Sequence, residues 1–157
     1  MMTNPQRGFT LLIAVILTSV LLSVGLALLD VAYKQVTLSS TARQSQTAFY
    51  AADSALECAL YWDQQHNAFS YTAPAATITC GNRTITPSSS VSGGIRTTTF
   101  DMACPSGGTS AQVTIRKGNV GVFCNTLGNS NCLYANGYNS CNVSDERRIE
   151  RGLKVVY

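Results

Sequence analysis

The hydrophobic and polar positions divide the chain into stretches of different character. Residues 1–8 are mostly polar and carry one charge, on Arg7. The next 21 residues, Phe9 to Leu29, carry no charge and read FTLLIAVILTSVLLSVGLALL. As an α-helix this segment is about 31 Å long, which is close to the hydrocarbon thickness of a bilayer. We therefore expect a membrane-spanning helix over residues 9–29, with everything after it held at a membrane.

The sequence predicts that this helix continues beyond the apolar segment, to about Gln64. Residues 30–66 contain neither glycine nor proline, the two strongest helix breakers. Apolar residues recur at intervals of three and four along one predicted face: Phe49, Ala52, Leu56, Ala59 and Leu60. Charged residues, Asp63 among them, are expected mostly on the other faces.

After Asn67, glycines, prolines and serines separate short segments that are typical of β-strands. The candidate strands are Thr77–Cys80, Ile95–Met102, Gln112–Arg116, Val120–Cys124 and Arg147–Tyr157. Lys117-Gly118-Asn119 is expected to be a hairpin turn between the third and the fourth of them. Such short connections leave no room for crossover helices, so the sheet should be antiparallel. We therefore predict an α+β fold in which the sheet packs on the C-terminal half of the long helix.

Six cysteines, all downstream of the apolar segment, indicate disulfide bonds: Cys58, Cys80, Cys104, Cys124, Cys132 and Cys141. The chain has one histidine and no Cys-x-x-Cys pair, so we expect no metal site. Six cysteines allow about 15 pairings. The single pair that we favour is Cys124–Cys132, because these two flank a turn-rich stretch. If all six pair, at least one bridge ties the helix to the sheet, because only Cys58 lies on the helix.

Composition and charge narrow the class of function. Charged residues make up 12% of the chain, against about 25% in a typical soluble domain. The net charge of +3 is too small to indicate nucleic acid as the main partner. Two basic clusters, Arg116-Lys117 and the basic residues within 147–154, keep DNA as a secondary candidate. Disulfides require an oxidising compartment, which orients the N-terminus toward the cytoplasm and the cysteines away from it.

The sequence offers no catalytic constellation. His66 is the only histidine, and we interpret it as a cap of the helix C-terminus. No GxSxG, HExxH, P-loop or GxGxxG motif is present. Asp53 and Glu57 are a like-charged pair four residues apart on the helix, which favours a solvated or interface role. We expect no enzymatic activity and no cofactor.

Residues 7–12, RGFTLL, resemble the class III signal of type IV pilins and pseudopilins, in which a short leader ending in glycine precedes an apolar helix. Residues 44–63, QSQTAFYAADSALECALYWD, are similar to the corresponding segment of minor pilins of the PilX type. The likeness covers about the first 65 residues. It implies a fold in which a long N-terminal helix is the spine and a disulfide-stapled sheet forms the head.

The resemblance implies that a prepilin peptidase cuts between Gly8 and Phe9 and methylates Phe9. Residues 1–8 are then the leader, 9–29 the transmembrane and filament-core helix, and 30–157 the periplasmic or extracellular head, including the second half of the helix. The implied partners are other pilin subunits, the peptidase, an inner-membrane assembly platform and, before assembly, the lipid bilayer. The expected function is that of a minor type IV pilus subunit, first single-pass in the inner membrane and then in an extracellular filament.

Three residues of the apolar helix are the expected assembly residues: Phe9, Ile13 and Gly25. Most pilins carry glutamate at the fifth residue after the cut, where this chain has Ile13. A carboxylate in lipid costs roughly 2.5–3.5 kcal/mol on insertion scales, so its absence indicates a minor or atypical subunit. Gly25 costs about 1 kcal/mol relative to alanine within a helix. It favours either close packing against another membrane helix or local melting when the helix leaves the lipid.

Two alternatives remain open at the level of the sequence. One is a pseudopilin of a type II secretion system, which forms a short periplasmic stub instead of a surface filament. The other is a membrane-anchored adhesin or binding module that never polymerises. Mass spectrometry of the mature N-terminus separates the pilin class from the simple anchor.

Overall fold

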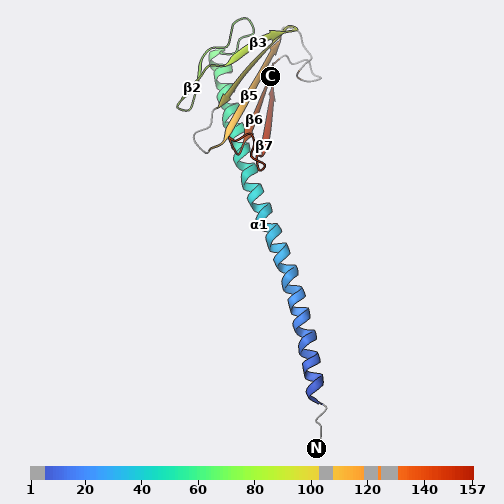
Figure 1. Ribbon diagram of the computed structural model, residues 1–157. Coiled ribbons are helices and arrows are strands. Elements are labelled where there is room, and N and C mark those ends of the chain that lie inside the picture. Colours follow the sequence, from blue (N-terminus) through green and yellow to red (C-terminus); the bar gives the residue numbers. More distant parts are fainter. Residues whose placement is uncertain (1–5, 103–107, 119–123, 125–130) are drawn as a thin grey trace, which may run out of the picture. The chain divides into compact units, whose positions relative to one another are not determined.

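The computed structural model describes residues 6–102, 108–118, 124 and 131–157. It begins with helix α1 (Gln6–His66), and seven strands follow in this described part of the chain. They are β1 (Ile78–Cys80), β2 (Arg83–Ile85), β3 (Ser88–Ser92), β4 (Ile95–Met102), β5 (Ser110–Gly118), β6 (Asn131–Tyr138) and β7 (Glu150–Val156) (Figure 1). The predicted α+β class, with one long N-terminal helix on an antiparallel sheet, is confirmed.

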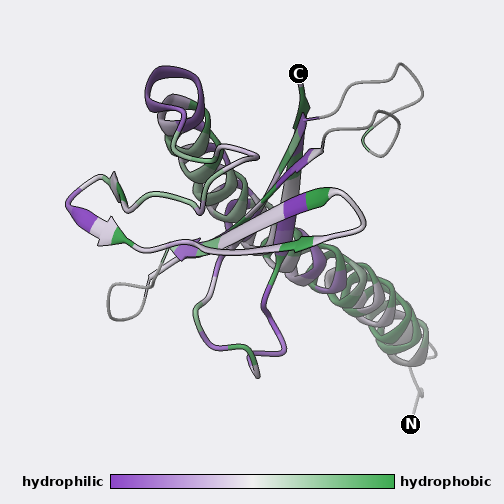
Figure 2. Ribbon diagram, turned by 90° about the horizontal axis from the view of Figure 1, so that it is seen from above, coloured by the Kyte–Doolittle hydropathy of each residue, from purple (hydrophilic) through white to green (hydrophobic). Residues whose placement is uncertain are grey.

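The chain separates into two compact units, here named the N-terminal unit (Met1–Ala42) and the C-terminal unit (Arg43–Tyr157). Helix α1 contributes residues to both. In the N-terminal unit the described chain is helix alone, mostly hydrophobic in its colouring (Figure 2). Hydroxyl groups of its apolar segment bond to the helix backbone: Thr18 Oγ1 donates to the carbonyl of Ala14 at 2.9 Å, and Ser23 Oγ donates to that of Val20 at 2.8 Å. The apolar helix therefore exposes few unsatisfied polar groups along its side.

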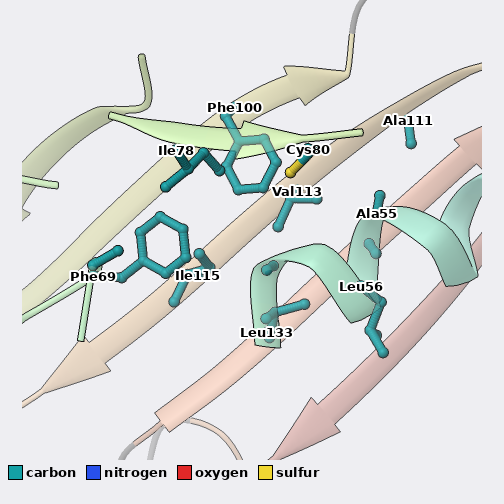
Figure 3. Packing of buried hydrophobic residues seen from close by; sticks show 13 residues of the cluster. Ala55, Leu56, Phe69, Ile78, Cys80, Phe100, Ala111, Val113, Ile115 and Leu133 are labelled. Atoms are coloured by element: carbon teal, nitrogen blue, oxygen red, sulfur yellow. The ribbon is translucent and has the colours of Figure 1, made fainter. Parts of the chain in front are cut away.

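The C-terminal unit holds two antiparallel sheets. One is the pair β1-β2, and the other has five strands in the order β3-β4-β5-β6-β7, each next to its neighbour in sequence. Alternation places one face of the larger sheet inward: in β5, Ala111, Val113 and Ile115 are buried, while the residues between them are partly or fully exposed. This face packs with helix residues and the β1 strand into one hydrophobic core, which also includes Phe69, Phe100 and Leu133 (Figure 3).

The helix approaches the sheet very closely because small residues line both sides. On α1, Ala48, Ala52, Ala55 and Ala59 are completely buried. Facing them in β6 is Gly137, where an added Cβ would lie 2.1 Å from the Ala48 carbonyl oxygen and 2.4 Å from the Ala52 nitrogen. Backbone atoms therefore occupy the space that any side chain at position 137 would need.

Two expectations about the helix faces are wrong. Phe49, predicted on the buried face, is 43% exposed, because the close approach of the alanines leaves no room there for an aromatic ring. Asp63, predicted away from that face, is only 5% exposed, because it continues the alanine stripe one turn beyond Ala59. The helix itself ends at His66, and Asn67 follows in a left-handed conformation, with φ of 49°.

The strand predictions were partly right. Strand β4 has the predicted bounds, and β1 and β7 lie within their predicted segments. The predicted turn at Lys117-Gly118 is wrong, because β5 runs through both residues and pairs with β6, a strand that was not predicted. Asn119 and residues 120–123 of the other expected strand lie outside the described residues, and Cys124 is not in a strand.

Candidate functional site

The four residues expected to take part in processing and assembly all lie on α1. Phe9 is 67% exposed and Ile13 is 40% exposed, and the two are one helical turn apart on the same face. Around Gly25, an added Cβ would meet nothing within 4 Å. Gly8 lies in the helix immediately before Phe9.

The surface around these residues is apolar on every side of the helix. All large apolar side chains between Phe9 and Leu29 are 40–71% exposed. In the described part of the chain, α1 is the one helix that is long and apolar enough to cross a membrane, by length and composition. An apolar surface this large is unfavourable in water, and its length and composition are those of a segment that could cross a membrane.

The first charged residues of α1 after the apolar segment form an ion pair. Lys34 Nζ lies 2.7 Å from Asp30 Oδ2, one turn away, and both side chains are more than 60% exposed. Such an exposed pair contributes little stability. Large apolar side chains remain exposed beyond it: Tyr33, Val36 and Leu38 are 70–74% exposed. This middle segment is therefore amphipathic in composition and open to contact.

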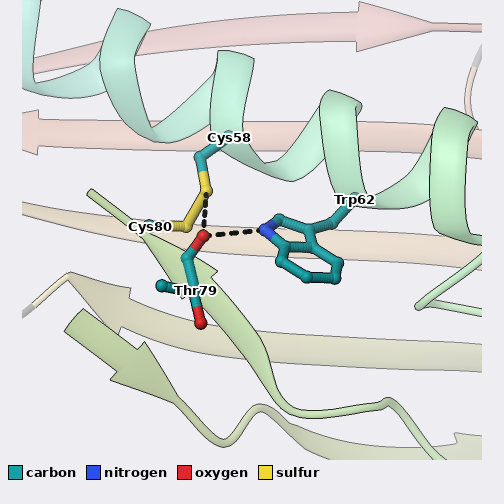
Figure 4. The surroundings of a disulfide bond; sticks show 4 residues. All are labelled: Cys58, Trp62, Thr79 and Cys80. Atoms are coloured by element: carbon teal, nitrogen blue, oxygen red, sulfur yellow. Dashed lines mark hydrogen bonds between the residues drawn. A yellow bond between two sulfur atoms is a disulfide. The ribbon is translucent and has the colours of Figure 1, made fainter. Parts of the chain in front are cut away.

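One disulfide ties the helix to the smaller sheet. Cys58 of α1 is bonded to Cys80 of β1, with a Cα–Cα distance of 5.9 Å. One turn further along the helix, Trp62 Nε1 donates a hydrogen bond to the carbonyl of Thr79 at 2.8 Å (Figure 4). The helix-to-sheet bridge that the cysteine positions required is therefore present, with a hydrogen bond beside it.

A second disulfide joins Cys124 to Cys132, the pair favoured from the sequence. Cys141 is also disulfide-bonded. Cys104 lies outside the described residues. None of the cysteines in the described ranges is free, which suits an oxidising compartment.

A buried polar cluster, which the sequence did not reveal, joins α1 to the sheet. Lys117 Nζ of β5 lies 2.5 Å from Asp63 Oδ1, and the Tyr157 hydroxyl donates to the other oxygen of the same carboxylate. The side chains of Lys117 and Asp63 are 13% and 2% exposed. Burial, and then the hydrogen bond to Asp63, raise the pKa of Tyr157 well above its ordinary value. The sequence feature that could have indicated this cluster is the position of Asp63, four residues after Ala59 and so on the same face of the helix.

The basic residues considered for DNA binding are mostly occupied by contacts within the chain. Arg151 Nε donates to Ser45 Oγ at 2.7 Å, and Lys154 Nζ donates to the carbonyl of Cys124 at the same distance. Lys117 is buried against Asp63. These contacts leave a smaller basic surface than the sequence suggested.

The residues weighed for catalysis are dispersed. Glu57 is exposed and Asp53 is half-buried on α1. His66, in the last turn, packs its ring 4.6 Å from that of Trp62. The described residues contain no group of three or more His, Cys, Asp or Glu side chains placed to hold a metal ion.

Comparison of the chain with protein-family models, with curated proteins and with solved structures found no match.

Proposed function

We propose that this protein is a minor subunit of a type IV pilus-like filament that polymerises through its N-terminal helix. The observation that carries the proposal is the uncharged helical surface from Phe9 to Leu29, apolar and exposed on every side. Lipid satisfies such a surface before assembly, and the helices of neighbouring subunits satisfy it afterwards. Because lipid is as apolar as a neighbouring helix, close packing rather than water exclusion drives the second step.

The C-terminal unit supports a role as an exposed head. It has its own core and two described disulfides, as expected of a domain that must stay folded outside the cytoplasm. In the proposed arrangement the N-terminus starts in the cytoplasm, and residues 30–157 lie on the periplasmic or extracellular side. Ile13, at the position where pilins usually carry glutamate, supports a minor rather than a major subunit.

The decisive measurement is mass spectrometry of the mature N-terminus, from protein made in a host with a prepilin peptidase. We expect cleavage between Gly8 and Phe9 and one added methyl group on Phe9. An intact Met1 would overturn the proposal in favour of a simple anchor. The substitution Gly8→Val should abolish cleavage, whereas Gly25→Ala, a matched glycine replacement within the helix, should leave it unchanged.

The destination of the processed protein separates a pilus from a secretion pseudopilus. We expect antibodies against the head to label filaments outside the cell and the protein to co-purify with sheared filaments. Retention of all the processed protein in the periplasm and inner membrane would instead favour the pseudopilin. Neither result decides whether the protein belongs to a pilin-like class, because that is decided by the mass of the mature N-terminus.

A further inference from the structure

A cleft of about 410 Å³ opens in the C-terminal unit, where the end of β4, the start of β5 and the end of β6 meet. The loop after β6, through Cys141, Val143 and Arg148, forms its other wall. Val143 is 77% exposed, so the mouth of the cleft is accessible. Two opposite charges line it: Asp101 at the end of β4, and Arg148.

Arg148 is held in a way that leaves its Nε donor without a partner among the described residues. Its Cζ atom lies 3.8 Å from the centroid of the Tyr138 ring, so the planar guanidinium covers the ring face. Its Nε is buried and makes no hydrogen bond to any described residue. A buried donor without a partner is unfavourable, and Arg148 is one of the residues that line the cleft.

The loop that carries Arg148 is fixed by hydrogen bonds on both sides. The Arg148 backbone nitrogen donates to the Asp145 carbonyl at 2.9 Å, and the Ile149 nitrogen donates to Asn139 Oδ1 at 2.6 Å. The Asp145 carboxylate accepts from the Arg147 nitrogen at 3.0 Å, which is the main cause of the lowered pKa of this carboxyl. The guanidinium is therefore positioned in advance of any ligand.

The opposite wall supplies an acceptor. Asp101 Oδ1 accepts a hydrogen bond from Gln112 Nε2, its cross-strand partner in β5, at 3.0 Å. Within the described ranges, no ion pair joins Asp101 to Arg148. A simple anion would be drawn to Arg148 but repelled by Asp101. A ligand that presents a carboxylate to the arginine and a hydrogen-bond donor to the aspartate complements both.

We propose that this cleft binds a small carboxylate-bearing molecule whose neighbouring hydroxyl or ammonium group donates to Asp101. Arg148 is the carboxylate-binding residue, because a guanidinium stacked on a ring still presents two parallel N–H groups along its edge. Acidic sugars and free amino acids share this chemistry. The site is independent of the proposed role in a filament, because it is built from residues of the C-terminal unit alone.

The test is saturation-transfer NMR on the full chain in lipid nanodiscs, with D-glucuronate, L-alanine and D-glucose as separate probes and empty nanodiscs as background. We expect millimolar binding of glucuronate, of alanine or of both, and none of glucose, which lacks the carboxylate. Binding of glucuronate alone assigns a hydroxyl as the donor, and binding of alanine alone assigns an ammonium. Absence of both signals, or equal binding of glucose, would overturn the proposal.

Variants connect the signal to the cleft. Arg148→Gln should weaken binding about tenfold, through the loss of a charge-assisted bidentate contact. Arg147→Gln removes the same charge from the adjacent exposed residue and should change binding less than twofold. If Arg148→Gln does not fold, as judged by circular dichroism, Arg148→Lys provides the test, because it keeps the charge and should still weaken binding several-fold. Equal affinities of the wild-type protein and the folded variant would refute the assignment.

Discussion

Two stretches of the same helix, residues 9–29 and 48–63, differ in the size and the exposure of their apolar side chains. The first consists mainly of leucine, isoleucine and valine and exposes them on every side. The second places alanine after alanine on one face and buries them completely. Large apolar residues all round indicate that the partners lie outside the chain. A stripe of small residues indicates a partner within it, brought to backbone contact at Gly137.

The two stretches also differ in whether they contain charged residues. No charge occurs between Phe9 and Leu29, where nothing in the chain could neutralise one. In residues 48–63 a carboxylate is buried, because Lys117 and Tyr157 converge on Asp63 from the sheet side. A charged residue on the buried face of the helix therefore indicates that the sheet supplies groups that pair with it.

The largest effect is expected from Asp63→Ala. The substitution leaves the Lys117 ammonium buried without its carboxylate, and removal of one partner of a buried ion pair costs about 3–5 kcal/mol. Unfolding of the full chain in micelles by guanidinium chloride, followed through Trp62 fluorescence, measures the loss. Glu57→Ala is the matched control, since this exposed carboxylate on the same helix should change stability by less than about 0.5 kcal/mol. Equal losses in the two variants would show that the buried pair adds no stability.

Paired glycine substitutions test the contrast between the two stretches directly. Gly137→Ala should destabilise the C-terminal unit by about 2–3 kcal/mol, because the new methyl group would overlap the backbone of Ala48 and Ala52. Gly25→Ala meets nothing and should favour the helix by up to about 1 kcal/mol. Trp62 fluorescence reports the first effect, and amide hydrogen exchange around residue 25 reports the second. A tolerated Gly137→Ala would mean that helix and sheet are further apart than the structure has them.

The same contrast explains which parts of the fold could be predicted from the sequence. The long helix, the strand Ile95–Met102 and the Cys124–Cys132 bond depend on local patterns, and local patterns are visible in a sequence. Strand β6 was missed because NCLYANGY lacks the β-branched residues typical of strands. Its small residues, Ala135 and Gly137, are selected by the helix that packs on them, which is a tertiary contact.

The candidate sites divide in the same way. The apolar segment over 9–29 is contiguous, so the sequence alone located it. The buried cluster at Asp63 and the cleft between Asp101 and Arg148 combine residues far apart in the chain. Charge and spacing along the sequence give no measure of such distances, and only the order and register of the strands bring these residues together.

The smallest effect expected is a pH dependence confined to the C-terminal unit. The pKa of Tyr157 is raised in the folded protein, whereas in the unfolded chain a tyrosine titrates near about 10. The stabilisation is therefore complete below about pH 10 and declines as the pH rises above it, because the unfolded state then releases a proton that the folded state retains. Tyr157→Phe should lose this decline while keeping every other titrating group. Trp62-detected unfolding between pH 8 and 11 measures it, and parallel curves for the wild type and the variant would contradict the raised pKa that burial and the hydrogen bond to Asp63 give Tyr157.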